Sequence, residues 1–90
     1  MSSHKRKDVA KRMARIHGHV HGILEMVKDD SRSYSEIVQQ ISAVKSALDS
    51  TIEVIVEDLL EDCVERTRKK KDAEMTQTLL EIKQVVNRLA

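Results

Sequence analysis

A chain of 90 residues with a net charge of +1 forms one small domain at most. It contains no Pro, two Gly and a single aromatic residue, a Tyr, so it lacks the turn-forming and strand-favouring residues that a β-sheet needs. The composition therefore excludes a sheet-containing fold and predicts an all-α protein.

The first predicted element is a helix over residues 5–29, preceded by a flexible tail at residues 1–4. Its apolar residues recur every three or four positions, the spacing of one continuous helix face. These residues are Val9, Met13, Ile16, Val20, Ile23 and Val27. Gly18 and Gly22 lie one turn apart outside this face. Because a glycine costs a helix about 1 kcal/mol relative to alanine, the pair suggests the close approach of another backbone.

The second predicted helix starts at a capping box that runs from Ser33 to Glu36. It continues without Gly or Pro to about residue 68, a length of about 50 Å. A third helix is predicted after the stretch of residues 69–72, with Asp72 as its N-cap and an apolar seam from Met75 to Leu89. Both helices carry apolar seams like that of the first helix.

These three apolar seams cannot all be covered within one thin protomer. We therefore expect residues 1–90 to form a single helical domain, whose first two helices make an antiparallel hairpin that dimerises into a four-helix bundle. No apolar run approaches the roughly 18 residues that cross a membrane, and the N-terminal segment is charged, unlike a secretory signal. One cysteine favours a reducing, cytoplasmic location. A Gly-rich phosphate loop and a nucleophile elbow are missing, which argues against an enzyme.

Positive charge is concentrated near the N-terminus, where residues 1–15 hold six basic residues against one acid. Such a segment predicts contact with nucleic-acid phosphates. The candidate DNA-binding residues are Lys5, Arg6, Lys7, Lys11, Arg12 and Arg15. Residues 25–62, by contrast, hold ten acids against three bases. A second basic run at 66–71 has two interpretations, a phosphate-binding patch or cations that favour a helix C-terminus.

Four histidines and one cysteine are the candidate metal ligands. His17 and His21 are one helical turn apart, so they share a flank and could chelate a divalent metal, although surface histidines are more often merely amphipathic. His4 could fold back as a further ligand. The single thiol, Cys63, is most simply a small packing residue, because no cation precedes it closely enough to activate it.

Three segments together resemble one family of regulators. Residues 15–23, with the sequence RIHGHVHGI, resemble the R-I-x-G-[QH]-V-x-G-I signature of the CsoR/RcnR-like transcriptional repressors, which sense copper, nickel or persulfides. Residues 40–49 match their second helix, and Cys63 falls where the family keeps a late cysteine. The resemblance implies a three-helix protomer, homodimers and disc-shaped homotetramers, and binding to double-stranded operator DNA without a helix-turn-helix. It also implies release from DNA when an effector binds between subunits.

The same resemblance implies effector-sensing positions at Tyr34, Leu59 and Cys63, where copper sensors have Cys, His and Cys. Only Cys63 is retained, so the usual Cu(I) site is not intact, and the nickel–cobalt pattern fares no better. Residues 46–56 resemble the persulfide-sensing branch, whose first cysteine is also missing here. His21 replaces an arginine usual in the family, and Ser50 fills a position that is often basic.

The sequence thus predicts a DNA-binding repressor with persulfide-type sensing at Cys63 or a nonstandard effector site. Two alternatives stay open for the response: a copper or nickel site, or the loss of any effector response. The residues available to such a metal are Cys63, His4, His17 and His21. A rival from another class is a helical protein-interaction module without specific DNA binding, favoured by the three seams and the acidic centre.

Overall fold

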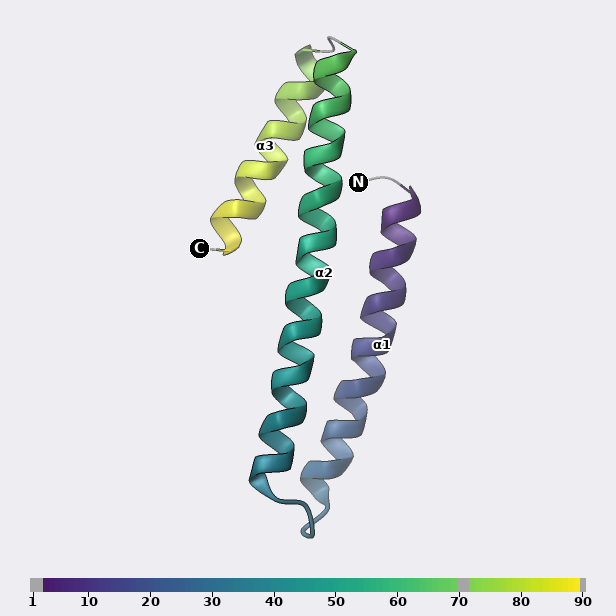
Figure 1. Cartoon of the computed structure of the whole chain (residues 1–90), viewed down its shortest axis with the longest axis vertical. Coiled ribbons are helices and arrows are strands. Elements are labelled where there is room, and N and C mark those ends of the chain that lie inside the picture. The colour runs from purple at the N-terminus through teal and green to yellow at the C-terminus, as the bar shows by residue number, and fades with distance from the viewer. Residues whose placement is uncertain (1–2, 70–71, 90) are drawn as a thin grey trace.

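The computed structural model describes residues 3–69 and 72–89 and contains three α-helices in this part of the chain. They are α1 (Ser3–Lys28), α2 (Tyr34–Arg68) and α3 (Asp72–Leu89). α1 and α2 form an antiparallel hairpin, and α3 folds back along the C-terminal half of α2, on the other side from α1 (Figure 1). α2 contacts both other helices, whereas the described parts of α1 and α3 do not contact each other. The predicted all-α fold of three helices is confirmed.

The protomer is a flat plate rather than a globule. Its principal extents are 60, 26 and 13 Å, and the smallest of these is close to the width of a single helix. The Cα radius of gyration is 17.8 Å, against about 12 Å for a compact domain of this length. Within the described residues, only four apolar side chains are buried: Ile16, Ile23, Val44 and Leu59.

The helix boundaries agree with the predictions to within one or two residues at most ends. α1 begins at Ser3 and ends at Lys28, so Ser3 and His4 of the expected tail are helical, whereas residues 1 and 2 lie outside the described residues. Asp72 is the first residue of α3 and not its cap, so its carboxylate acts within the first turn.

Ser33 caps α2 as predicted. Its hydroxyl accepts the backbone N–H of Glu36 at 3.1 Å, whereas the Glu36 carboxylate lies 3.6 Å from Arg32 Nη1. In the preceding turn, the Ser31 hydroxyl and N–H both donate to Asp29, at 2.7 and 3.0 Å. These bonds, the hydroxyl bond foremost, lower the pKa of Asp29. The chain reversal is therefore stabilised by side-chain hydrogen bonds rather than by glycine or proline.

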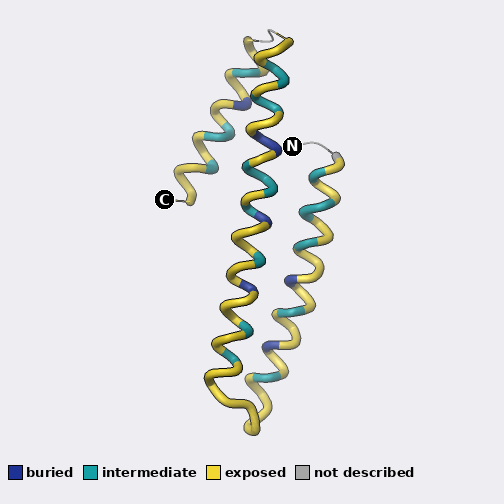
Figure 2. Tube along the Cα trace, viewed as in Figure 1, coloured by how far each residue is buried: buried dark blue, intermediate teal, exposed yellow. Residues whose placement is uncertain are grey.

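The predicted seam of α1 is only partly buried by α2. Ile16 and Ile23 pack with Val44, and Ile37 and Ala47 lie against this cluster. The other seam residues of α1 are more open: Met13, Val20 and Val27 are 44, 47 and 57% exposed. Figure 2 shows the same sparse burial along the whole hairpin.

The structure also tests two further expectations, one about the two glycines of α1 and one about membrane-spanning helices. Apart from the adjacent residues and the local backbone of α1, no atom lies within 4 Å of the point where a Cβ would stand at Gly18 or Gly22, so the expected close approach of another backbone is absent within the described part of the protomer. Among the described residues, no helix is both long and apolar enough to span a membrane.

A polar network joins α3 to α2. Arg66 Nε lies 2.9 Å from Asp62 Oδ2, and its Nη1 lies 2.7 Å from Glu74 Oε2 on α3. The buried hydroxyl of Thr78 lies 2.9 Å from the same Asp62 oxygen. Arg66 and Asp62 of α2 therefore bind Glu74 and Thr78, which lie one turn apart near the start of α3.

Candidate functional site

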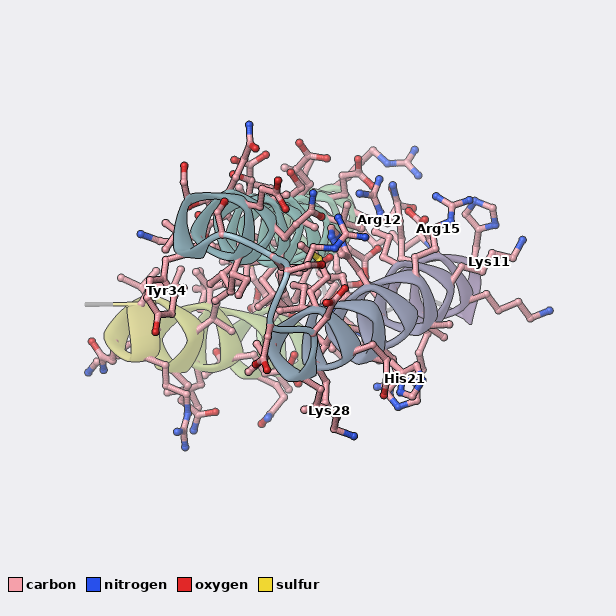
Figure 3. All side chains as sticks on the ribbon, turned by 90° about the horizontal axis from the view of Figure 1, so that it is seen from below. Lys11, Arg12, Arg15, His21, Lys28 and Tyr34 are labelled. Atoms are coloured by element: carbon pink, nitrogen blue, oxygen red, sulfur yellow. The ribbon has the colours of Figure 1, made fainter. Side chains whose placement is uncertain are left out.

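The hairpin has one polar side on which two arginines face a hydroxyl-bearing stretch of α2. Arg12, Arg15 and Ile16 of α1 line a groove of 220 Å³ with Ala47, Ser50 and Thr51 of α2, which we call the arginine groove. Figure 3 shows Arg12 and Arg15 together on this side of α1, with Lys11 pointing outward and His21 and Lys28 on the other side. The groove exists because Ile16 of α1 is buried against α2. Arg12, one turn before Ile16, and Arg15, the residue before it, therefore lie beside α2.

The charges around the arginine groove are available to a ligand. Arg12 Nε lies 3.3 Å from Asp8 Oδ1, in an ion pair whose side chains are 38 and 40% exposed. Such an open pair contributes at most about 1 kcal/mol, so an incoming phosphate can replace Asp8 as the partner of Arg12. In the described part of the chain, Lys7, Lys11 and Arg15 are exposed and make no ion pair.

The two remaining basic candidates, Lys5 and Arg6, lie near the start of α1, beside the C-terminal half of α2. Lys5 and His4 border an open groove of 610 Å³ whose remaining lining residues come from α2 and are mostly acidic. Those α2 residues are Asp58, Glu61, Asp62, Glu65 and Arg66. Arg6 lies instead beside α3, in a pocket that also contains Glu81 and Arg88. An acidic groove repels a phosphate chain, so the arginine groove is the better candidate for phosphate binding.

The second basic run serves the structure rather than forming a free patch. Arg66 is held between Asp62 and Glu74, and Arg68 Nη2 lies 2.6 Å from Glu65 Oε1. The Asp62 hydrogen bond raises the pKa of Arg66, and the same bond is the main cause of the lowered pKa of Asp62. Lys69 pairs with Glu65 at 3.3 Å, and residues 70 and 71 lie outside the described residues. The interpretation as charges that stabilise helix ends is therefore favoured for residues 66–69.

The three effector positions are not brought together within one protomer. Tyr34 is the first residue of α2 and is 88% exposed, whereas Leu59 is buried and Cys63 is half-buried near the other end of the helix. Cys63 follows Tyr34 by 29 positions, which corresponds to about 44 Å along α2. Leu59 offers no donor atom, so this set does not fit the coordination of a copper or nickel ion.

The histidines of α1 divide into two groups. Nε2 of His19 lies 2.7 Å from Oε1 of Gln40, in a hydrogen bond that links α1 to α2. His17 and His21 are exposed. His4 lies in the acidic groove near the start of α1, more than three turns away. Among the described residues, no three His, Cys, Asp or Glu side chains are arranged to hold a metal ion.

The sequence did not predict the polar network around Arg66 or the contact of His19 with Gln40. The pairing of Asp62 with Arg66 could have been found from their spacing of one turn, which favours an ion pair on a helix. Nothing in the sequence marks Thr78 or Gln40 as partners of residues 16 and 21 positions away. Those contacts depend on how the helices dock.

The fold and the site define a class of protein: a thin helical protein with a basic groove and with apolar faces that the described helices leave exposed. A family model described as "Metal-sensitive transcriptional repressor" matches residues 5–88. A solved structure, "The nickel-responsive transcriptional regulator InrS", is 30% identical, covers 93% of this chain and 91% of its own, and has a TM-score of 0.76. The comparison with curated proteins gives no match.

The chain therefore belongs to the metal-sensitive transcriptional repressors, the family of the CsoR/RcnR-like regulators. This confirms the resemblance found in residues 15–23 and around Cys63. Members of this family are transcriptional regulators and not enzymes, which confirms the prediction that the chain has no catalytic role.

Proposed function

We propose that this protein is a DNA-binding transcriptional repressor that works in the cytoplasm as an oligomer and leaves its operator DNA in response to an effector. The observation that carries the proposal is the arginine groove, in which two guanidinium groups lie on one side of the α1–α2 hairpin. Membership of a repressor family supports it.

Double-stranded DNA would lie along the arginine groove. Arg12 and Arg15 would each bind a phosphate through paired N–H groups, with Ser50 as a hydroxyl donor beside them. Lys7 and Lys11 would add contacts on the outer side of α1, and Lys5 and Arg6 would extend the positive surface toward the start of the helix. These contacts fix the position of the protein on DNA but do not read its sequence.

The uncovered apolar residues of the hairpin would pack against a second copy. On α1 and the first half of α2 they are Met13, Val20, Leu24, Val27, Val38, Ile41 and Leu48. Two such hairpins would form a four-helix bundle, and two bundles would form the disc-shaped homotetramer expected of the family. A charge in this face, as in Ile41→Glu, should dissociate the oligomer in a light-scattering measurement, whereas an unchanged mass would remove this face from the interface.

The effector response is assigned to Cys63. An antiparallel pairing of two α2 helices would bring Tyr34 near the partner subunit's Cys63, which places the thiol at a subunit boundary. Transfer of one sulfane sulfur atom from a polysulfide to the thiolate would give a Cys63 persulfide and a polysulfide shorter by one sulfur. The larger, charged group would then disfavour the oligomer geometry that fits DNA.

DNA binding is tested by a fluorescence-anisotropy titration. The probe is the DNA upstream of the protein's own operon, with a scrambled duplex alongside, at two salt concentrations. Tight, selective and salt-sensitive binding is the expected result. Equal weak binding to both duplexes would sink the repressor proposal and favour the protein-interaction module.

The sensing step has its own test. Mass spectrometry after polysulfide treatment should show a gain of one sulfur atom at Cys63 and a loss of DNA affinity, both abolished in Cys63→Ser. An unmodified Cys63 with undisturbed DNA binding would refute thiol sensing and leave DNA binding itself untouched.

A further inference from the structure

His17 and His21 stand apart from every contact described so far. They lie one turn apart on α1, both exposed, and neither makes a hydrogen bond or an ion pair within residues 3–69 and 72–89. Residues at this spacing have their side chains on the same helix flank, with Cβ atoms about 5–6 Å apart. Two imidazoles so placed can direct one ring nitrogen each toward a common point.

The surface around this pair is open. Apart from the adjacent residues and the local backbone of α1, no atom lies within 4 Å of a Cβ position at Gly18 or Gly22, the residues that follow each histidine. His21 lies on the side of α1 away from Arg12 and Arg15 (Figure 3). A ligand at the two histidines would therefore meet neither the arginine groove nor the α1–α2 contact.

His19, between them, shows that the three histidines are not equivalent. It is half-buried and bonded to Gln40 at 2.7 Å, so its ring is engaged with α2. The ring nitrogens of His17 and His21 are therefore available to a ligand, whereas Nε2 of His19 is bonded to Gln40, although the three histidines lie within five residues of one another. His19 provides a matched control within the same turn of the same helix.

We propose that His17 and His21 form a two-histidine chelate for a divalent transition metal ion of the Ni²⁺ class on the outer surface of α1. Imidazole suits Ni²⁺, Cu²⁺ and Zn²⁺ and does not suit the oxygen-preferring Mg²⁺ and Ca²⁺. Because the described residues offer no group of three such ligands, water completes the coordination. The site is separate from Cys63 and does not rest on the proposed repressor function.

Binding is measured by isothermal titration calorimetry with Ni²⁺ alone, on the full chain carrying Cys63→Ser so that the thiol cannot contribute. One Ni²⁺ per chain is expected. His17→Gln and His21→Gln should each weaken binding by roughly 100-fold, because the second ligand of a chelate acts at high effective concentration. His19→Gln should bind as the parent does. Equal affinity in all variants, or a loss in His19→Gln alone, would overturn the proposal.

A second measurement needs no substitution at the histidines. Paramagnetic Ni²⁺ should broaden the imidazole proton resonances of His17 and His21 in the NMR spectrum at concentrations that leave those of His19 and His4 sharp. Broadening of His4 instead would move the site to the acidic groove and refute the chelate. Acid should release the metal, since an imidazole must be unprotonated to bind it. Neither readout involves DNA, so failure of the repressor proposal would leave both results unaffected.

Discussion

The two helix junctions of this protein are built from different interactions. α1 meets α2 through Ile16, Ile23 and Val44, with one interhelical hydrogen bond from His19 to Gln40. α3 meets α2 through a charged network centred on Arg66, with Asp62 and Glu74 as its partners. The first junction therefore responds to changes in packing and the second to salt and acid. A disturbance can loosen α3 while the hairpin stays formed.

The largest expected effect comes from the packing of the hairpin. Ile23→Ala removes one of the few buried side chains between α1 and α2 and should lower the free energy of unfolding by roughly 2–5 kcal/mol. Urea unfolding followed by circular dichroism measures it. Lys45→Ala, an exposed change beside Val44, should cost less than about 0.5 kcal/mol. Similar losses in both variants would show that the hairpin is not held by this cluster.

DNA binding is expected to depend on the arginine groove and not on the basic residues at the end of α2. Arg12→Ala and Arg15→Ala should each weaken binding to every DNA sequence and reduce the slope of log affinity against log salt by about 1. Arg68→Ala, which alters a cation already paired with Glu65, is the matched control and should leave the slope unchanged. A slope that falls equally in all three variants would place DNA on both ends of the molecule.

The charged junction should be weaker and should fail separately. Arg66→Met leaves Asp62 and Glu74 without their shared cation and should weaken the docking of α3 by less than Ile23→Ala weakens the hairpin, because partly exposed ion pairs contribute little to stability. Amide hydrogen exchange should then speed up along α3 and stay unchanged in α1. Uniform acceleration in all three helices would show that the junctions do not act independently.

Acid should have the smallest effect and should act at the same junction. The pKa of Asp62 is lowered from 3.8, mainly by its hydrogen bond with Arg66. A lowered pKa in the folded chain means that the charged form stabilises the fold above pH 3.8, and that this stability is lost as the pH falls below 3.8. The protection of α3 amides, measured against their intrinsic exchange rates at each pH, should therefore fall over this range, and Asp62→Asn should remove this change. An unchanged profile in Asp62→Asn would assign the effect to other carboxylates.

Local features of the fold could be predicted from the sequence, because they depend on neighbours along the chain. The Ser33 cap is an example, since a cap needs only the hydroxyl and an N–H three residues later. The burial of the seam was only partly predictable. Val20 and Val27 share the spacing of Ile16 and Ile23 but stay exposed in the protomer, because a seven-residue repeat does not say which chain will cover it.

The candidate site was harder to predict for a related reason. Charge alone predicts Arg12 and Arg15 as phosphate contacts, whereas the groove itself depends on which flank of α1 faces Ser50 of α2. The difference between His19 and the pair of His17 and His21 likewise appears only when α2 is docked. Spacing shows which side chains share a flank, whereas docking decides which flank is covered.

Because the protomer is only 13 Å thick, its stability and its resistance to proteolysis should depend on the concentration of the protein. A plate one helix deep has almost no interior of its own, so in the proposed oligomer its folded state would gain stability mainly by association with further copies, and that gain would rise with the protein concentration. The melting temperature should therefore fall on dilution. In a cell, a drop in synthesis would lower the number of copies and also expose each remaining copy to proteolysis. Repression governed by such a protein would be lost more steeply than in proportion to its concentration.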